Sequence, residues 1–406
     1  MGGGQGGQAE SASEWEAILA EATKREADIA PGLVLLAVDK NGKSLYHKAC
    51  GFNSRLPDAP AIKDDDIMWI ASCTKLLTSV CALRCVERGQ VDLDEDLGQS
   101  HLPEFKNPMV VTLDDSEKGY NLRPAKNPIT LRRLLTHTSG VAYEWGDSRL
   151  RAWRKDVGPI PDDKKGFMQH LYDIPLLFDP GEGWVYGGGI DWAGILVGRL
   201  NNTTLGGYME EHIFKPLGMK DTTFYLSTRP DLEKRLVRAG KRGPDGGMIP
   251  FEGMVFRAEA HDESGGGGLW SCATDYIKVL ADLIKDEPTL LKRDTVVNML
   301  AKPQLKDGEA LKALSKGRGG AVAANAANPS DAGINYGLGG MVQVKTSAFL
   351  PGGTLSWGGL PNLKWFIHPE LGIAAMYATQ VMPSGDAKNL DLSRKYFKEI
   401  IRLSGN

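Results

Sequence analysis

Ser72 and Lys75 are three residues apart at what has the features of a helix start. In a helix, residues at this spacing share a face, so the Lys75 ammonium can fold back onto the Ser72 hydroxyl. The N–H groups of the first turn have no partners and can stabilise negative charge. A serine hydroxyl attacks once a base takes its proton, and a lysine among apolar neighbours can be shifted toward that form. The pair therefore predicts a nucleophilic serine.

The Ser-x-x-Lys spacing alone is weak support, because it occurs by chance in most long chains. The alternative is an exposed serine that caps a helix, followed by a solvated lysine. Apolar residues at helical spacing favour a buried helix that would cover the lysine stem: Leu76, Leu77, Val80, Leu83 and Val86. The rest of the chain has to decide between the two interpretations.

Composition excludes several classes of function. At 406 residues the chain exceeds the usual size of a single core, so two subdomains are expected. A net charge of -3 with 24% charged residues gives no electrostatic argument for nucleic acid or for an anionic membrane. No stretch has the length of a membrane-spanning helix, and the glycine-rich start resembles a disordered lead rather than a signal peptide.

The cysteines and histidines point away from disulfides and metals. Five cysteines are an odd number, and Cys81 and Cys85 are too far apart along one helix for an easy disulfide. Reduced thiols in the cytoplasm are therefore expected. Cys73, next to Ser72, is better interpreted as a buried structural residue than as a nucleophile. The seven histidines show no metal-binding spacing, so no metal or other cofactor is implied.

Turn and periodicity signals outline the elements. A helix is expected at 13–27, capped by Ser11 or Ser13, and strands at 32–38 and 44–51 flank the hairpin signal Asn41-Gly42. The helix after Ser72 should end near Gly89. Further helices are expected at 129–135 (opened by Thr130), 164–172, 189–200, 205–213, 274–284 (opened by Thr274) and 390–402, and strands at 336–345, 354–357, 363–368 and 373–378.

Strands near both termini with helices between them predict an α+β fold, in which one antiparallel sheet is built from the two chain ends around a mainly helical insert. The expected subdomains are 11–70 with 335–406 for the sheet and 71–334 for the helices, after a disordered lead at 1–10. A hairpin insertion is expected at about 100–128, with one strand near Met109, and a long surface connection at 301–331.

Four motifs in order resemble the serine β-lactamase and penicillin-binding-protein superfamily, in its class C-like branch of esterases and acyltransferases. They are Ser72-Cys73-Thr74-Lys75, the stretch 129–140, the stretch 214–222 and the stretch 265–271. The insertion before Ile129 and the phrases around Tyr186 and Trp357 are most similar to fungal polyketide-tailoring transesterases of the lovastatin acyltransferase type. The resemblance covers about residues 15–400 and implies the β-lactamase/transpeptidase-like fold.

The second motif of that superfamily supplies a tyrosine, usually as Tyr-x-Asn after a Pro-Gly turn. Here Pro180-Gly181 is followed by Tyr186, with Gly188 where the asparagine would stand. The resemblance implies that Tyr186 is catalytic. An adjacent Lys75 ammonium favours the phenolate, so the two could relay the Ser72 proton to the leaving group. Which of them is the formal base stays open, and they should titrate as a coupled unit.

The third motif of lactamases carries a cation that helps to receive the drug's carboxylate, whereas this chain has Trp357-Gly358-Gly359. Esterases and acyltransferases of the branch carry the same three residues, so efficient β-lactam hydrolysis is not expected. A strand without side chains lets a substrate carbonyl approach backbone N–H groups. The amide of Ser72, with that of Gly359 or Leu360, would form the oxyanion hole.

The resemblance implies a ping-pong reaction, in which Ser72 takes an acyl group from a thioester and gives it to an alcohol of a polyketide-like metabolite. The donor would be a polyketide synthase carrier domain or a small thioester. A hydrolase (carboxylesterase or lactonase) with the same acyl-enzyme and a non-catalytic binding relative are the alternatives. We expect a monomer that binds a small-molecule acceptor, with neither nucleic acid nor membrane as partner.

Aromatic residues are the candidates for substrate contact. Tyr143, Trp145, Trp270 and Trp357, with Gly358, are expected to line an apolar cleft suited to a polyketide body, although each of the aromatics could instead be structural. His137 lies in a helix-ending turn and is interpreted as a buried, hydrogen-bonded residue rather than as a base for a serine.

Overall fold

The computed structural model describes residues 4–26, 28–114, 119–159, 174–260, 262–316 and 333–405. The side chains of residues 4–13 and of Trp145 are outside this description, as is the helix predicted at 164–172. The predicted connection at 301–331 contains the helix α12 (Glu309–Lys316), and its remainder from 317 is also outside the described residues.

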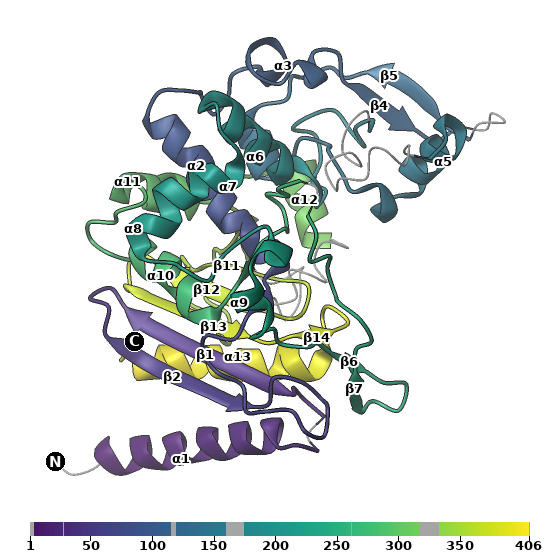
Figure 1. Ribbon diagram of the computed structural model, residues 1–406. Coiled ribbons are helices and arrows are strands. Elements are labelled where there is room, and N and C mark those ends of the chain that lie inside the picture. Colours follow the sequence, from purple (N-terminus) through teal and green to yellow (C-terminus); the bar gives the residue numbers. More distant parts are fainter. Residues whose placement is uncertain are drawn as a thin grey trace.

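The central sheet has seven antiparallel strands in the order β2-β1-β13-β12-β11-β10-β9 (Figure 1). The strands are β1 (Gly32–Asp39), β2 (Ser44–Gly51), β9 (Ile334–Tyr336), β10 (Met341–Gln343), β11 (Leu355–Gly358), β12 (Lys364–His368) and β13 (Ile373–Ala378). β1 from the first part of the chain pairs with β13 from the last part. The predicted sheet built from both chain ends is therefore confirmed.

One predicted strand is wrong. Residues 336–345 form a hairpin rather than a single strand, because β9 ends at Tyr336 and β10 starts at Met341. The Gly337 N–H donates to Gly340 O at 2.7 Å, and Gly340 has a φ of 157°. This glycine-rich segment makes a tight turn, and at Gly340 a residue with a Cβ would rarely adopt the required φ.

Two helices cover one face of the sheet: α1 (Gly4–Thr23) and α13 (Ala387–Leu403) (Figure 1). Trp15, Leu19 and Ala22 are buried on one side of α1, where they join β1, β13 and α13 in one apolar cluster. The predicted bounds of α1 were wrong, because the helix starts at Gly4, inside the predicted disordered lead, and ends at Thr23. Glycine is a poor helix former, so the sequence favoured a later start.

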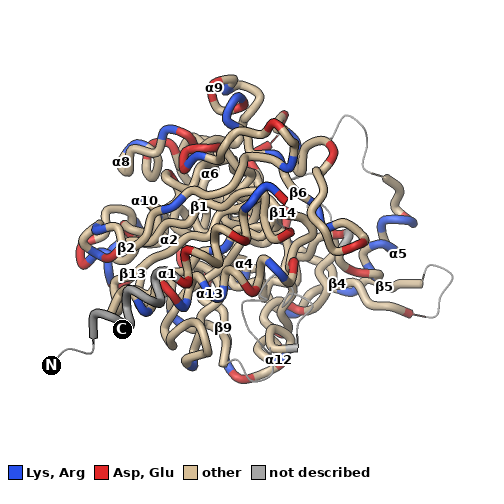
Figure 2. Tube along the Cα trace, turned by 90° about the horizontal axis from the view of Figure 1, so that it is seen from below, with Lys and Arg blue, Asp and Glu red and all other residues tan. Residues whose placement is uncertain are grey.

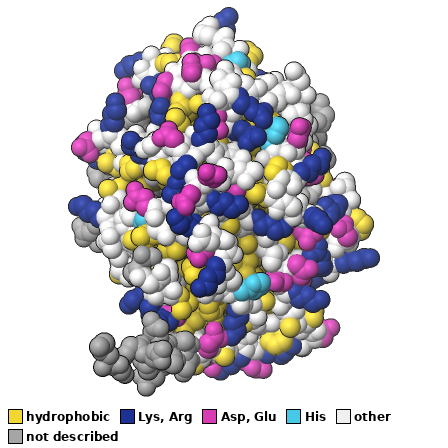
Figure 3. Space-filling view, turned by 90° about the vertical axis from the view of Figure 1, so that its left-hand side faces the viewer, with side chains coloured by type: hydrophobic (Ala, Val, Ile, Leu, Met, Phe, Trp, Pro, Cys, Tyr) yellow, Lys and Arg dark blue, Asp and Glu magenta, His cyan; other side chains and the backbone are white. Residues whose placement is uncertain are grey.

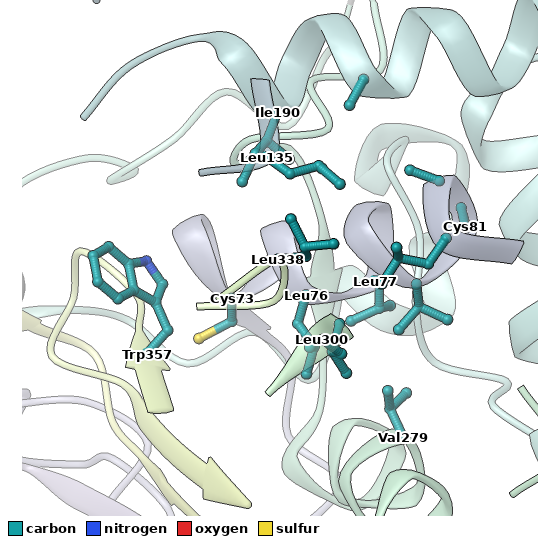
Figure 4. Close-up of a cluster of buried hydrophobic side chains, with 14 of the residues drawn as sticks. Cys73, Leu76, Leu77, Cys81, Leu135, Ile190, Val279, Leu300, Leu338 and Trp357 are labelled. Carbon is teal, nitrogen blue, oxygen red and sulfur yellow. The ribbon is translucent and has the colours of Figure 1, made fainter. Parts of the chain in front are cut away.

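The other face of the sheet packs against the helical region. Its central helix, α2 (Thr74–Glu87), is buried on most sides, and Leu76 and Leu77 lie among residues from several other segments (Figure 4). The other helices and short helical segments are α3 (Leu97–Ser100), α4 (Leu131–Leu135), α5 (Ser148–Val157), α6 (Gly189–Leu200), α7 (Leu205–Met209), α8 (Lys215–Leu217), α9 (Pro230–Glu233), α10 (Ala273–Leu283) and α11 (Arg293–Thr295).

Helix ends match the prediction in part. α6 has the predicted bounds, and the Thr130 side chain caps α4 by accepting from the Arg133 N–H. The helix predicted at 205–213 divides, since α7 ends at Met209 and continues as a π-type turn. α10 begins at Ala273 after Cys272, so Thr274 is not its cap; its hydroxyl instead contacts the Cys272 sulfur.

Within the described residues, three small sheets accompany the central one. β4 (Met109–Thr112) and β5 (Asn121–Pro124) form the hairpin predicted within 100–128, and β4 lies beside α5 (Figure 1). β3 (Met68–Trp69) pairs with β8 (Trp270–Ser271) directly before the Ser72 segment. β6 (Gly240–Arg242) pairs with β7 (Met248–Pro250) and β14 (Val381–Met382).

Charged side chains are mixed in sign. Acidic and basic positions are interspersed over the chain trace (Figure 2), and the face in Figure 3 shows both signs mixed with apolar side chains. Within the described part of the chain, none of the helices combines the length and apolar character that crossing a bilayer requires.

Lys364 in β12 is a buried charge, with 6% of its surface exposed and no acceptor for its ammonium among the described residues. Burial, together with the positive charge of Arg394, lowers the pKa of Lys364 to about 8. Because the unfolded chain binds this proton more tightly, stability should rise between about pH 8 and 10.5, where only the folded state loses it.

We expect Lys364→Met to raise the free energy of unfolding at pH 7 by up to roughly 3 kcal/mol and to flatten that rise with pH. Urea unfolding at pH 7 and pH 10 measures both effects. The exposed Lys398 of α13 provides a control, since Lys398→Met should change neither. A Lys364→Met protein that is less stable than the parent at pH 7 would contradict the argument.

Candidate active site

Ser72 lies in a short 3-10 turn, Ala71–Cys73, that leads into α2. The turn is anchored to the Gly-rich segment 265–269, because the Ile70 N–H donates to Leu269 O at 3.1 Å. Ala71 has a φ of 46°, a left-handed value that is uncommon for a residue with a Cβ and marks local strain beside the serine. Among the described residues, none accepts from the Ser72 N–H, so this amide is free to meet a substrate oxygen.

Tyr186 is held by backbone contacts between its loop and the turn after α4. The Val185 N–H donates to His137 O at 3.0 Å. A Cβ on Gly187 would lie 2.3 Å from Val141 O, so only glycine permits this close approach. The loop begins at Asp179, whose carboxylate accepts two bonds from Arg123 of β5, which hold the pKa of Asp179 at about 2. The hairpin thus helps to fix the loop that carries Tyr186.

The Tyr186 hydroxyl donates a hydrogen bond to Ser72 Oγ at 2.7 Å. The contact joins two residues that are 114 positions apart in the sequence. It is the direct partner that a serine nucleophile needs for proton transfer. The structure therefore brings together the predicted serine and tyrosine.

Lys75 contacts Ser72 indirectly. Its Nζ donates to Gly266 O at 2.5 Å, lies 3.4 Å from the Tyr143 hydroxyl and is 4.6 Å from the centre of the Tyr186 ring. The expected Lys75–Ser72 hydrogen bond is absent between these two described residues. That prediction was wrong because the Lys75 ammonium donates to the Gly266 carbonyl, which a distant segment supplies, and Ser72 accepts its hydrogen bond from Tyr186. Lys75 is 2% exposed, so its charge acts in a poorly solvated site.

Aromatic rings surround Tyr186. Its ring centre lies 4.7 Å from that of His137, 5.4 Å from that of Trp357 and 6.1 Å from that of Tyr143. Tyr336 at the end of β9 packs on both His137 and Trp357. These contacts fix the orientation of the phenol ring.

His137 is buried and accepts a hydrogen bond on Nδ1 from the Gly187 N–H at 3.4 Å, which confirms the sequence interpretation. Burial and the nearby Lys75 charge hold the pKa of His137 well below its usual range, so the ring is neutral. Cys73 is also buried, and burial raises the pKa of its thiol well above the usual range, which agrees with a structural role. All five cysteines are unpaired.

The two alternatives for the second oxyanion donor differ in the structure. The Gly359 N–H is already used, because it donates to Leu363 O at 2.9 Å. The Leu360 N–H has no acceptor among the described residues. A Cβ on Gly359 would lie 2.5 Å from Ile70 O, so the glycine lets this strand end approach the Ser72 segment. The free amide at this end of β11 is that of Leu360.

The predicted substrate-binding residues separate into two groups. Trp357 and Tyr143 lie beside Tyr186, while Gly358 ends β11 with no room for a Cβ because Leu363 O would be 2.4 Å away. Trp270 pairs with Trp69 in a different apolar cluster and lines a cavity of about 500 Å³ away from Tyr186. Trp145 belongs to the short turn Glu144–Gly146, and its side chain lies outside the described residues.

Two residues of the site were given no role by the sequence. Tyr336 completes the aromatic wall, and Asp191 of α6 accepts from the Tyr143 hydroxyl at 3.2 Å. An aspartate inside the apolar run of α6 is a detectable signal, since a buried carboxylate requires hydrogen-bond donors. Tyr336 has no comparable signal, because aromatic residues are common in strands.

The sequence is similar to known proteins over most of its length. A family model described as Beta-lactamase matches residues 20–396. The chain belongs to the Beta-lactamase family. It is 35% identical over 408 residues to acyltransferase calJ of Penicillium decumbens, covering 92% of this chain and 94% of that protein. It is 33% identical over 377 residues to lovastatin esterase of Penicillium rubens, covering 91% and 94%.

Among solved structures of this family, unliganded simvastatin synthase (LovD) from Aspergillus terreus matches with a TM-score of 0.87 and 32% identity. The match covers 96% of this chain and 97% of that one. The β-lactamase/transpeptidase-like fold predicted from the motifs is thereby confirmed, as is the resemblance to fungal acyltransferases of the lovastatin type.

Proposed function

We propose that this Beta-lactamase family member is a serine acyltransferase that moves an acyl group from a thioester to an alcohol of a polyketide-like metabolite. The observation that carries the proposal is the 2.7 Å contact between the Tyr186 hydroxyl and Ser72 Oγ, with the Lys75 ammonium 4.6 Å from the phenol ring. The names of the relatives, acyltransferase and synthase as well as esterase, support acyl chemistry.

In the first half-reaction, Ser72 Oγ attacks the thioester carbon. In the reacting state Tyr186 is a phenolate, and its oxygen takes the serine proton because it is the group in contact with Ser72. The C–S bond then breaks, the thiolate takes the proton from Tyr186, and an acyl-Ser72 ester remains. We assign the proton transfer to Tyr186, and Lys75 supports it by offering a positive charge to the phenolate.

In the second half-reaction, an alcohol oxygen attacks the acyl-Ser72 carbon. Tyr186 takes the alcohol proton and returns it to Ser72 Oγ as the acyl–serine bond breaks, so the enzyme ends in its starting state. The negative oxygen of each tetrahedral intermediate would lie between the Ser72 and Leu360 N–H groups, which lack acceptors among the described residues.

Esters and thioesters fit the site better than β-lactams do. The place where lactamases of the superfamily offer a cation to the drug is occupied by Trp357, which is 2% exposed and packed on Tyr186. An indole carries no charge, so it cannot form an ion pair with a carboxylate. We therefore propose acyl donors that bind through apolar contact at this end of the site.

A hydrolase that gives the same acyl group to water is the second candidate, and the name of the 33% identical lovastatin esterase favours it. The two reactions share the residues named above and differ in whether water reaches acyl-Ser72. A purely binding relative is disfavoured by the intact contact between Ser72 and Tyr186.

The finer points of the assignment are also proposals. We propose a carrier-domain thioester or a small thioester as donor, and a chain that acts as a monomer. Five unpaired thiols support a reducing compartment such as the cytoplasm. The mixed surface charge in Figure 3 gives no reason to invoke nucleic acid or an anionic membrane.

Product analysis tests the proposal. The purified protein would be incubated with an acyl thioester, with and without candidate polyketide alcohols, and ester and free acid would be measured by mass spectrometry. We expect ester whose yield rises with alcohol concentration. Free acid alone at all alcohol concentrations would leave the hydrolase as the function, and identical mixtures with Ser72→Ala would exclude catalysis at Ser72.

A further inference from the structure

We infer that Asp191 is a positioning residue, which holds the Lys75 ammonium at the site through Tyr143 and balances its charge. The inference rests on the proposed function, because it assigns a role within the same acylation step. It also changes the interpretation of Tyr143, which becomes the connection between Lys75 and Asp191 rather than part of the substrate cleft.

Asp191 is fully buried in α6 and has hydrogen bonds at both carboxylate oxygens. Oδ1 accepts from Ser264 Oγ at 2.6 Å and from the Gly266 N–H at 2.8 Å, while Oδ2 accepts from the Tyr143 hydroxyl at 3.2 Å. A buried carboxylate needs such donors, and a buried negative charge also needs a positive charge nearby. The nearest cation in this network is Lys75.

Two paths join Asp191 to Lys75. Tyr143 Oη donates to Asp191 and lies 3.4 Å from Lys75 Nζ, so one hydroxyl contacts both charged groups. Gly266 gives its N–H to Asp191 and its carbonyl to Lys75, so one backbone residue also contacts both. A Cβ on Gly266 would lie 2.4 Å from Asp191 Oδ2, which explains why the Gly-rich segment has no side chain there.

The sequence supports this role for Tyr143. The superfamily motif usually places an asparagine two residues after the tyrosine, and this chain has Gly188 at that position. Gly188 offers no side chain, and Tyr143 supplies a side-chain oxygen 3.4 Å from Lys75 Nζ. Burial and the Asp191 charge raise the pKa of Tyr143 well above its usual range, so it stays a neutral phenol that can donate to Asp191 and accept from Lys75.

Few ionisable groups among the described residues face this network. They are Lys75 of α2, Tyr143, Tyr186, His137 after α4 and Tyr336 of β9. Buried His137 is neutral because its pKa lies well below its usual range, and burial raises the pKa of Tyr336 well above its usual range, so neither changes charge near neutral pH. Removal of the Asp191 charge should therefore act on the pair formed by Lys75 and Tyr186.

The test measures the rate at which an alkyl fluorophosphonate labels Ser72, as a function of pH. Asp191→Asn keeps the shape of the side chain but removes its charge. We expect labelling at pH 7 to be about tenfold slower. The pH at which labelling declines on the alkaline side should fall by about one unit, because the Lys75 ammonium loses the negative charge of Asp191 that favours it.

Asp282→Asn is the matched control. Asp282 of α10 is also fully buried, and it accepts from the N–H groups of Thr289 and Leu290, away from the site. Both variants should lower the thermal midpoint, but only Asp191→Asn should move the pH profile. An unmoved profile for Asp191→Asn, or an equal movement for Asp282→Asn, would overturn the inference.

Tyr143→Phe separates positioning from substrate binding and serves if Asp191→Asn fails to fold. A positioning role predicts a lower kcat for thioester with little change in KM, together with slower labelling by the small fluorophosphonate. A role in the substrate cleft predicts a higher KM with normal labelling, and that result would overturn the inference. Absence of labelling in the unmodified protein would instead contradict the proposed function itself.

Discussion

Ser72→Ala, Lys75→Ala and Tyr186→Phe should each lower the rate of acyl-enzyme formation by at least about 10³-fold. Ser72→Ala removes the oxygen that bonds to the acyl group. Tyr186→Phe removes the hydroxyl that lies 2.7 Å from that oxygen, and Lys75→Ala removes the charge beside the phenol. Single-turnover kinetics with an acyl thioester, followed by mass spectrometry of the intact protein, measure the effect.

Members of one catalytic unit should be strongly non-additive, so the double variant Lys75→Ala/Tyr186→Phe should be little slower than either single variant. Independent, multiplying losses would show that Lys75 acts on a separate step. Cys73→Ala provides the adjacent control, because the Cys73 thiol is buried and its raised pKa keeps it neutral. It should retain most of the activity, and a loss as large as that of Ser72→Ala would implicate the thiol.

The sequence predicted elements where local pattern and tertiary packing agree. Strand β13 and helix α6 have the predicted bounds, because β13 is an apolar run that begins after Gly372 and α6 is a largely apolar run that ends before Asn201. The sequence-based prediction failed where glycine occurs both in turns and inside a helix. Gly337 to Gly340 turn the chain between β9 and β10, whereas glycine at the start of the chain lies inside α1. Local composition cannot distinguish these contexts.

The site was predicted as far as its motifs extend. Ser72, Lys75 and Tyr186 come together as expected, but the Lys75 partner was wrong because the Gly266 carbonyl is 191 positions away in the sequence. Helical spacing describes only what lies on the same helix. Tyr143 contacts Lys75 from a further segment, and Asp191 of α6 is connected to Lys75 through Tyr143. Trp270 joins a different apolar cluster. Such contacts depend on how the segments pack.

The last strong effect concerns the backbone of the oxyanion site. Replacement of Leu360 by its α-hydroxy acid, through nonsense suppression, turns one amide into an ester. The exchange removes the N–H and weakens the Gly359 carbonyl as an acceptor, which accepts no backbone hydrogen bond among the described residues. We expect acylation of Ser72 to slow by about 10²- to 10³-fold, because this N–H lacks an acceptor among the described residues and can stabilise the tetrahedral oxyanion. The thermal midpoint should change little, because no hydrogen bond within the described fold is lost.

The same exchange at Gly359 should lower the stability of the fold more than it lowers the acylation rate. Its N–H donates to Leu363 O at 2.9 Å, so its loss should cost about 1 kcal/mol of stability and leave most of the acylation rate. The two ester variants therefore distinguish a donor that holds the strand end from a donor that meets the substrate. A slow, stable Gly359 ester beside a fast Leu360 ester would reverse the assignment, and it would require the β11 end to rearrange when substrate binds.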